Sequence, residues 1–370
     1  MRPATKRLAL GLATLALALA PALPSPASAE TAAPQTTAPQ TAAHPGKHKP
    51  DNLRELARKL GIHIGTAVDV TALAEEDDYR RVLNREFTHI TAENAMKWES
   101  VEPERGVYNW EGADAVVENA RRNHQRVRGH TLVWHNQLPA WLTQGVESGE
   151  IDAAELRAIL RDHIKKEVGR YRGKIRAWDV ANEVIDDDGN MRQSIWLTHL
   201  GPGYIADAFR WARQADPHAK LYLNDYNLEW DTDKIDAYLN LVKQLQAQRV
   251  PLDGMGFQGH LGIQYDYPGD FPNVMRKFTD LGLEVAITEA DARMVLPVTP
   301  EKLARQAEFF RDMLKTCAAN RRCTEFTVWG FTDRHSWVPE WFEGEGAATP
   351  MDENLAPKPA YTAMLGVRRF

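Results

Sequence analysis

Short apolar runs alternate with longer amphipathic stretches from about residue 60 to the carboxyl end of the chain. The short runs are rich in β-branched and aromatic residues, which is typical of buried strands. The longer stretches carry apolar residues at intervals of three and four, which predicts helices, most clearly over 155–168, 234–248 and 302–315. The predicted strands are 62–68, 87–92, 126–133, 175–180, 220–224, 254–258, 284–288 and 326–329.

Eight such alternations predict an α/β fold in which parallel strands are covered by helices. Closure of the sheet into a (β/α)8 barrel, the TIM barrel, is inferred from the number of strands. The region 51–370 contains no second linker and no internal repeat, and its length suits one such barrel. We therefore expect a single barrel domain over 51–370.

Polar and aromatic side chains directly follow most of the predicted strands. In a (β/α)8 barrel the carboxyl ends of the strands lie on one face, and that face carries the active site. Side chains far apart in the sequence are therefore expected to meet in one cleft. The residues at these ends are Glu93, Asn94, Trp134, His135, Asn182, Glu183, Asp225, Tyr226, Asn227, Gln258, Gly259, His260, Glu289, Ala290, Asp291 and Trp329.

The first fifty residues do not follow the barrel pattern. Three basic residues precede an apolar run over 8–23, and Ala27-Ser28-Ala29 offers a small-residue cleavage site. This pattern predicts a signal peptide over 1–29, and hence a secreted, extracellular protein. A membrane anchor is the alternative, but the run is short for a bilayer and prolines interrupt it. Residues 30–50 are mainly Thr, Ala, Pro and Gln with no large apolar side chain, which predicts a disordered linker.

The overall charge narrows the range of partners. The formal net charge of −6 gives no basic footprint for nucleic acid, and no glycine-rich phosphate loop is present. The two cysteines, Cys317 and Cys323, lie close together in the sequence. In an exported protein such a pair favours a disulfide, and two thiols without a nearby histidine pair make a poor zinc site.

Two glutamates provide the strongest chemical signal. Glu183 and Glu289 each follow an apolar run, after the fourth and seventh predicted strands. Glycoside hydrolysis needs two carboxyl groups beside the scissile bond: one donates a proton, and the other attacks the sugar or activates water. A single glutamate of this kind is more often a solvated loop residue. Two at strand ends, beside Asn182 and Asp291, favour catalysis.

The histidines at the strand ends raise the alternative of a metal site. His130, His135 and His260 lie near the two glutamates in the expected fold. No spacing typical of zinc ligands occurs among them, and the amide-rich neighbourhood favours hydroxyl groups as ligands. We therefore expect no metal and no other cofactor. His135 is the one of the three best explained by packing, as are Trp196 and Trp211, which fall in predicted helices.

From about residue 51 to the end, the chain resembles the retaining endo-β-1,4-xylanases of glycoside hydrolase family 10. The resemblance rests on seven motifs in the family's order, and the cysteine pair before the last strand also looks like the family's disulfide. The motifs are Glu93-Asn94 with Lys97-Trp98, Gly129 to His135, Asp179 to Glu183, Asn224 to Asn227, Gln258-Gly259-His260, Thr288 to Asp291, and Trp329-Gly330-Phe331 with Ser336-Trp337.

The resemblance implies a role for each matching residue. Glu183 is expected to be the general acid/base and Glu289 the nucleophile, with His260 and Asp291 keeping Glu289 ionised and oriented. Asn182 would bond the sugar 2-hydroxyl. The broad amphipathic faces of Trp134, Trp329 and Trp337 suit sugar rings better than core packing. The expected substrate-binding residues are Glu93, Asn94, Lys97, His130, Trp134, Gln137, Asn182, Tyr226, Gln258, Trp329 and Trp337.

The expected substrate is xylan and xylo-oligosaccharides, and the expected state is a monomer without a membrane or nucleic-acid partner. A β-1,4-glucanase, a non-catalytic xylan-binding barrel and a metal-dependent hydrolase are the alternatives. Three residues depart from the family pattern towards smaller side chains, which could loosen the packing behind the glutamates. They are Ala181, Gly259 and Ala290.

Overall fold

The structure, a computed structural model, describes residues 49–369, and in it eight parallel strands close into a barrel. β1 pairs with β2 on one side and with β9 on the other, and β9 also pairs with β8. The prediction of a (β/α)8 barrel is therefore confirmed. The barrel strands are β1 His63–Val68, β2 His89–Ala92, β3 Arg126–Gly129, β4 Ala177–Asn182, β5 Lys220–Asp225, β6 Gly254–Phe257, β8 Glu284–Val295 and β9 Cys323–Val328.

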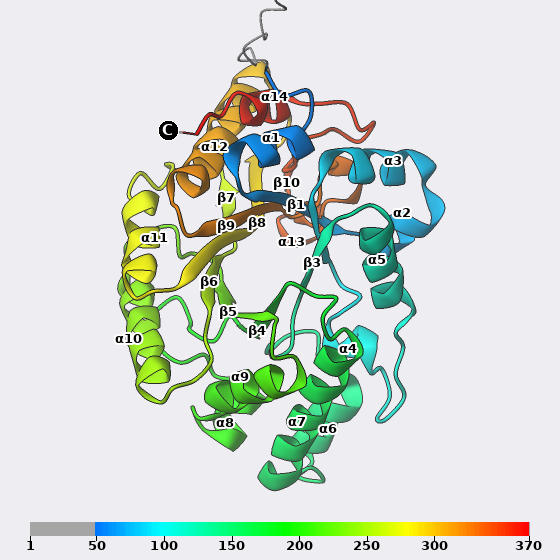
Figure 1. Cartoon of the computed structure of the whole chain (residues 1–370), viewed down its shortest axis with the longest axis vertical. Helices are drawn as coiled ribbons and strands as arrows, with labels where there is room; N and C mark the ends of the chain where they lie inside the picture. Colours follow the sequence, from blue (N-terminus) through cyan, green and yellow to red (C-terminus); the bar gives the residue numbers. More distant parts are fainter. Residues whose placement is uncertain (1–48, 370) are drawn as a thin grey trace, which may run out of the picture. The chain divides into compact units, whose positions relative to one another are not determined.

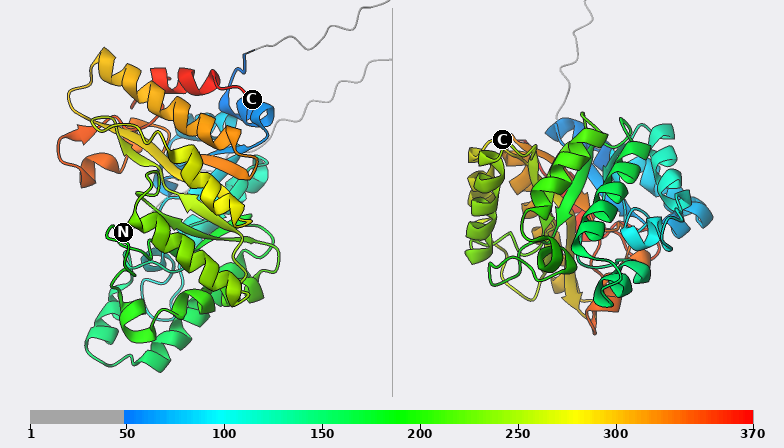
Figure 2. Two further views of the ribbon diagram at one scale, coloured as in Figure 1. Left: turned by 90° about the vertical axis from the view of Figure 1, so that its left-hand side faces the viewer. Right: turned by 90° about the horizontal axis from the view of Figure 1, so that it is seen from below.

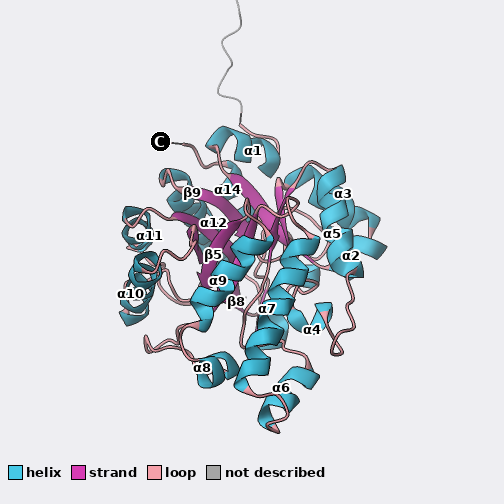
Figure 3. Ribbon diagram, turned by 60° about the horizontal axis from the view of Figure 1, so that its bottom comes forward, coloured by secondary structure: helices cyan, strands magenta, loops and turns pink. Residues whose placement is uncertain are grey.

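Helices surround the strands, as Figure 1 shows in sequence colours and Figure 3 shows by element type. Two further views place the same helices around the sheet (Figure 2). The helices are α1 Leu53–Leu60, α2 Val70–Glu75, α3 Asp77–Glu86, α4 Trp98–Val101, α5 Glu111–Arg122, α6 Ala140–Glu147, α7 Ala153–Arg170, α8 Ile195–Leu200, α9 Tyr204–Ala215, α10 Asp233–Ala247, α11 Phe271–Asp280, α12 Pro300–Ala319, α13 Val338–Trp341 and α14 Pro359–Leu365.

Local chemistry fixes where the helices begin and which face they bury. The Asp152 side chain accepts a hydrogen bond from the Glu155 N–H at 2.8 Å and so caps α7, an interaction worth about 1 kcal/mol. Leu156, Leu160 and Ile164 follow at intervals of four and are fully buried. Their burial packs α7 against α9 and α8.

The two ends of the described chain pack together. Glu86 at the end of α3 accepts a hydrogen bond from the Leu53 N–H of α1 at 3.0 Å and from the Tyr361 hydroxyl of α14 at 2.8 Å. Figure 1 shows α1, α12 and α14 side by side at the top of the view. One buried carboxylate thereby joins the first and last helices.

The barrel interior holds a buried ionic group as well as apolar side chains. Arg128 of β3, 1 % exposed, pairs with Asp179 of β4 and with Glu325 of β9. The ring of Tyr222 lies 4.5 Å from the Arg128 guanidinium. Burying a charge is tolerated only when partners satisfy it, and Arg128 has a carboxylate on each side.

The order and approximate positions of the predicted strands are confirmed, but several of the predicted ends are wrong, most clearly in two strands. The strand predicted over 126–133 ends at Gly129, although Leu132 and Val133 still donate to the carbonyls of Asp179 and Val180. The strand predicted over 284–288 continues to Val295, because two short strands pair with its second half. These strands, β7 His260–Gly262 and β10 Glu345–Gly346, were not predicted.

The predicted disulfide is confirmed: Cys317 of α12 is bonded to Cys323 of β9. The predicted signal peptide and most of the predicted linker lie outside the described residues. Within 49–369, no helix has the length and apolarity needed to cross a bilayer.

Candidate active site

Glu183 is the first residue after β4, and its backbone has an unusual conformation. Its φ is 55°, in the left-handed region that costs a non-glycine residue energy, and its N–H donates to the Asn224 carbonyl at 2.9 Å. Asn182, the last residue of β4, is 2 % exposed. The strand thus holds both side chains at the carboxyl end of the barrel.

Glu289 lies within β8, and the unpredicted strand β7 explains its surroundings. Alternate residues of a strand face the same side, so Glu289 and Asp291 point the same way. The pairing of β7 with β8 sets His260 directly opposite Asp291. His260 Nδ1 lies 2.8 Å from Asp291 Oδ2, and His260 Nε2 lies 3.2 Å from Glu289 Oε2.

The electrostatics of this trio favour an ionised Glu289. Burial alone would lower the pKa of His260, but the charges and hydrogen bonds of Asp291 and Glu289 raise it to about 10. Burial would also raise the pKa of Glu289, but His130 and His260 outweigh it and lower that pKa. A protonated imidazole therefore lies beside a carboxylate at neutral pH.

Two amides connect the glutamates. Asn224 Nδ2 of β5 donates to Glu289 Oε1 at 2.8 Å and to Asn182 Oδ1 at 2.9 Å. Asn182 Nδ2 in turn lies 3.3 Å from Glu183 Oε1. Each carboxylate keeps a small exposed fraction of its side chain, 12 % for Glu183 and 6 % for Glu289. Both are thus held at one end of the barrel without being sealed from solvent.

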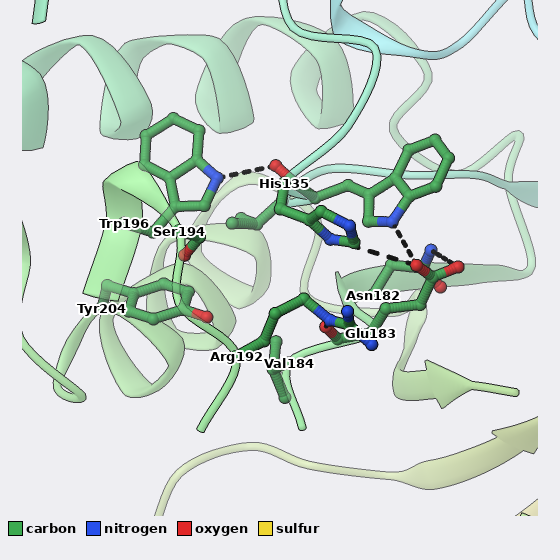
Figure 4. Close-up of a pocket in the computed structure, with 10 residues that line it drawn as sticks. His135, Asn182, Glu183, Val184, Arg192, Ser194, Trp196 and Tyr204 are labelled. Carbon is green, nitrogen blue, oxygen red and sulfur yellow. Dashed lines mark hydrogen bonds and ion pairs between the residues drawn. The ribbon is translucent and has the colours of Figure 1, made fainter. Parts of the chain in front are cut away.

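The hydrogen-bond donors of Glu183 are neutral, whereas Glu289 contacts the charged His260 as well as the neutral Asn224. Trp134 Nε1 donates to Glu183 Oε2 at 2.8 Å, and Gln258 Nε2 donates to Glu183 Oε1 at 3.0 Å. His135 Nδ1 lies 3.9 Å from Glu183 Oε2, as Figure 4 shows, and burial lowers the pKa of this histidine. The expectation that His135 serves only packing is therefore too narrow.

A niche of about 10 Å³ lies behind Glu183, between His135 and Arg192 (Figure 4). This volume suits about one water molecule. Arg192 Nε donates to the Glu183 carbonyl at 2.7 Å, and its Nη2 donates to the Tyr226 hydroxyl at 2.7 Å. The predicted binding residue Tyr226 is thus connected to Glu183 through Arg192.

Four of the predicted binding residues form one cluster. Lys97 Nζ donates to Asn94 Oδ1 at 2.8 Å and to Gln137 Oε1 at 2.6 Å, and it lies 5.1 Å from the Trp134 ring centre. Burial lowers the pKa of Lys97 and raises the pKa of the nearby Glu93 to about 7. The cluster provides closely spaced donors and acceptors suited to sugar hydroxyl groups.

The remaining predicted residues surround Glu289. His130 Nδ1 lies 3.0 Å from Asp179 Oδ2 and 3.9 Å from Glu289 Oε1. Trp337 Nε1 donates to Asp291 Oδ2 at 2.9 Å. Trp329 is only 6 % exposed and lies edge-on to His130, with ring centres 5.2 Å apart, so little of its face is available to a sugar.

The helical tryptophans were assigned to packing. Trp196 is 1 % exposed and stacks on Trp98, and its Nε1 also donates to the Trp134 carbonyl at 2.6 Å. Trp211 is half-buried against the core. Trp196 therefore packs as predicted and in addition holds the segment that carries Trp134.

The three small residues that depart from the family pattern are all buried. Ala181 and Ala290 are almost fully buried. Gly259 has a φ of 79°, which glycine adopts without cost, and a Cβ there would meet Ile287 Cγ2 at 3.2 Å. Its N–H donates to Glu229 Oε1 at 2.8 Å.

Three residues that contribute contacts to the candidate active site were not among the predicted site residues. Asn224 and Asp179 stand in recognised motifs, but only the folded barrel brings Asn224 to Glu289 and Asp179 to His130. Arg192 lies in the loop after β4, and no sequence pattern marks it. Among residues 49–369, no three or more His, Cys, Asp or Glu side chains are arranged to hold a metal ion.

The comparisons with known proteins agree with this geometry. The chain is 46 % identical over 315 residues to an endo-1,4-beta-xylanase of Agaricus bisporus, covering 85 % of this chain and 93 % of that protein. It is 44 % identical over 318 residues to endo-1,4-beta-xylanase B of Thermotoga neapolitana, covering 84 % of this chain and 90 % of that protein.

Solved structures give the same result. Xylanase 10B of Thermotoga petrophila RKU-1, in complex with xylobiose, superimposes with a TM-score of 0.82 at 42 % identity, covering 87 % of this chain and 99 % of that one. Native xylanase 10B of Thermotoga maritima superimposes with a TM-score of 0.81 at 43 % identity, covering 85 % of this chain and 96 % of that one. The model of glycosyl hydrolase family 10 matches residues 52–367, and the chain therefore belongs to this family.

Proposed function

We propose that this protein is an endo-1,4-β-xylanase that cleaves internal xylosidic bonds with net retention of anomeric configuration. The observation that carries the proposal is the contrast between two linked carboxylates. Glu289 lies against a protonated His260, whereas Glu183 receives hydrogen bonds from the neutral donors Trp134 and Gln258. Glu289 is thereby held ionised for attack, and Glu183, whose hydrogen-bond donors carry no charge, is the carboxyl group left to exchange the proton.

In the first step, Glu289 attacks the anomeric carbon while Glu183 donates its proton to the leaving oxygen. The transition state carries positive charge on the sugar ring, and the ionised Glu289 stabilises it. Asn182 lies between Glu183 and Asn224, which is a suitable place for bonding the sugar 2-hydroxyl.

In the second step, Glu183 takes a proton from water, and that water attacks the glycosyl-enzyme ester. Esterification removes the negative charge of Glu289. The repulsion between the two carboxylates then disappears, so Glu183 can stay ionised and act as a base. Water attacks the anomeric carbon from the side of the sugar ring that the leaving group occupied, so the product keeps the β configuration.

Proton NMR of fresh products tests this proposal. Hydrolysis of linear xylan is expected to release the β-anomer first, with the α-anomer appearing by mutarotation. Release of the α-anomer first would exclude a covalent intermediate on Glu289.

The proposal extends to substrate and location. Relatives named as xylanases and a structural neighbour in complex with xylobiose support xylan and xylo-oligosaccharides as ligands. Export is supported by the basic and apolar pattern of residues 1–29 and by the disulfide between Cys317 and Cys323. Action as a monomer is part of the proposal.

A further inference from the structure

The amino-terminal end of the barrel contains a cavity of about 230 Å³. Its lining includes the first residues of six barrel strands. Glu183, in contrast, follows the last residue of β4, and Glu289 lies inside β8, well after its first residue Glu284. The cavity therefore opens on the face opposite the candidate active site and is distinct from it. These first residues are His63, Arg126, Ala177, Lys220, Glu284 and Cys323.

Positive charge in this cavity is incompletely neutralised. Arg126, Arg176 and Arg321 line it, and within residues 49–369 none of the three guanidinium groups forms an ion pair or hydrogen bond with another side chain. Lys220 differs, because its ammonium lies 3.0 Å from Glu284 and 3.4 Å from Asp253. The guanidinium groups of these three arginines thus have N–H donors available to a ligand.

The acidic residues of the lining are already engaged elsewhere. Glu284 contacts Lys220 and accepts a hydrogen bond from the Tyr222 hydroxyl at 2.9 Å. Glu325 pairs with the buried Arg128 and lies 3.6 Å from His89. Neither carboxylate forms an ion pair with the three arginines in the described part of the chain, although the charge of Glu325 partly offsets that of Arg126.

The pKa values of Arg126 and His63 also indicate an excess of positive charge in the cavity. The pKa of Arg126 is lowered by burial and by repulsion from Arg176. The pKa of His63 is lowered to about 4 by burial and by Arg126, and its buried Nδ1 has no hydrogen-bond partner in the described part of the chain. An anion would relieve this repulsion.

We propose that this cavity binds a small oxyanion, with Arg126, Arg176 and Arg321 as its ligands. A guanidinium group presents two parallel donors that match the oxygens of a carboxylate or a phosphate. The cavity has room for a molecule larger than one ion. Inorganic phosphate and the carboxylate of a uronic acid share this chemistry, and the proposal does not depend on the function assigned to the glutamates.

Isothermal titration calorimetry on the full chain at low salt tests the proposal with inorganic phosphate, glucuronate and neutral xylose. At least one anion is expected to bind saturably with a Kd on the order of 1 mM or below. Arg126→Gln and Arg176→Gln are each expected to weaken that binding roughly tenfold or more. Saturable binding of phosphate alone identifies a phosphate site, and binding of glucuronate identifies a site for acidic sugars.

The matched control is Arg161→Gln, which removes an exposed arginine of α7 outside the cavity and is expected to leave the Kd unchanged. Arg321→Gln extends the test if the partly buried Arg176→Gln variant does not fold. The variants are expected to keep wild-type hydrolysis of xylan, so failure of this proposal and failure of the catalytic one are distinguishable. Absence of saturable anion binding, or equal weakening by Arg161→Gln, would overturn the proposal.

Discussion

His260 is the residue that most directly controls the charge of the proposed nucleophile. Replacing it with asparagine removes a positive charge 3.2 Å from Glu289, so the pKa of Glu289 is expected to rise. The acid limb of the kcat/KM profile should then move to higher pH, because the ionised carboxylate must attack. The maximum of kcat/KM is expected to fall roughly 10- to 100-fold, the value of a charge-assisted hydrogen bond.

The control for this variant is His199→Asn, which changes an exposed histidine of α8. Its pH profile should match that of the wild type. An unshifted acid limb in His260→Asn would show that His260 does not hold Glu289 ionised, whatever the loss in rate.

Trp337 is expected to contribute to substrate choice. Xylose lacks the hydroxymethyl group of glucose, and a pocket that excludes one small group discriminates by about 1–3 kcal/mol, roughly 10- to 200-fold. Aryl xylobiosides should therefore be cleaved faster than aryl cellobiosides by about that factor. Trp337→Ala is expected to narrow the ratio of the two kcat/KM values; an unchanged ratio would place the selectivity elsewhere.

At this scale the sequence identified the reacting residues better than their supporting contacts. Glu183, Glu289 and His260 follow predicted strands in recognised motifs, so their convergence could be predicted. Arg192 could not, because its contact with Glu183 depends on how the loop after β4 folds back. The burial of Trp329 likewise depends on neighbours from other strands.

At the scale of elements, the disulfide joins α12 to β9 across a sequence separation of 6. It closes a short loop at the end of the barrel where β9 begins, far along the strand from the catalytic face. Closing such a loop is worth roughly 2 kcal/mol of unfolding free energy by the chain-entropy model. The double variant Cys317→Ser/Cys323→Ser should lose about that amount in urea denaturation and keep its kcat.

Reduced wild-type protein provides the matched comparison, since it lacks the bond but keeps both cysteines. It should show the same loss as the double variant. A large fall in kcat without a change in stability would contradict a purely structural role for the disulfide.

The order of the barrel strands could be read from alternating apolar runs, but their ends could not. β8 runs well past its predicted end because β7 and β10 pair with it, and these partners are only three and two residues long. Such short segments have too few residues to show a period of two. This matters for the site, because the pairing of β7 with β8 is what brings His260 to Asp291.

For the whole molecule, buried histidines predict a loss of stability in acid. Burial lowers the pKa of His163 to about 3, and burial together with Arg126 lowers that of the half-buried His63 to about 4, both below the ordinary 6.5. Between these values the unfolded chain binds protons that the folded protein excludes, so the unfolding free energy falls as the pH drops from about 6.5. Each histidine contributes up to about 1.4 kcal/mol per pH unit. The buried Glu167 lies 3.3 Å from His163, and burial raises the pKa of Glu167, so its own titration partly offsets this effect.

Urea denaturation at several pH values between about 3.5 and about 7 checks this expectation, because this interval covers most of the gap between the folded and unfolded pKa values of these histidines. His163→Asn should flatten the dependence on pH, whereas His218→Asn, at an exposed position, should leave it unchanged. An equal slope in all three proteins would mean that His163 is not kept neutral by burial.

The most direct test of the account is azide rescue of two variants on an activated aryl β-xylobioside. Glu289→Ala should be almost inactive, and azide should restore turnover with an α-glycosyl azide as product, because azide takes the place of the missing nucleophile. Glu183→Ala should instead give a β-glycosyl azide, because azide then attacks the glycosyl-enzyme. A β-product from Glu289→Ala, or the same product from both variants, would contradict the assignment of the two carboxylates.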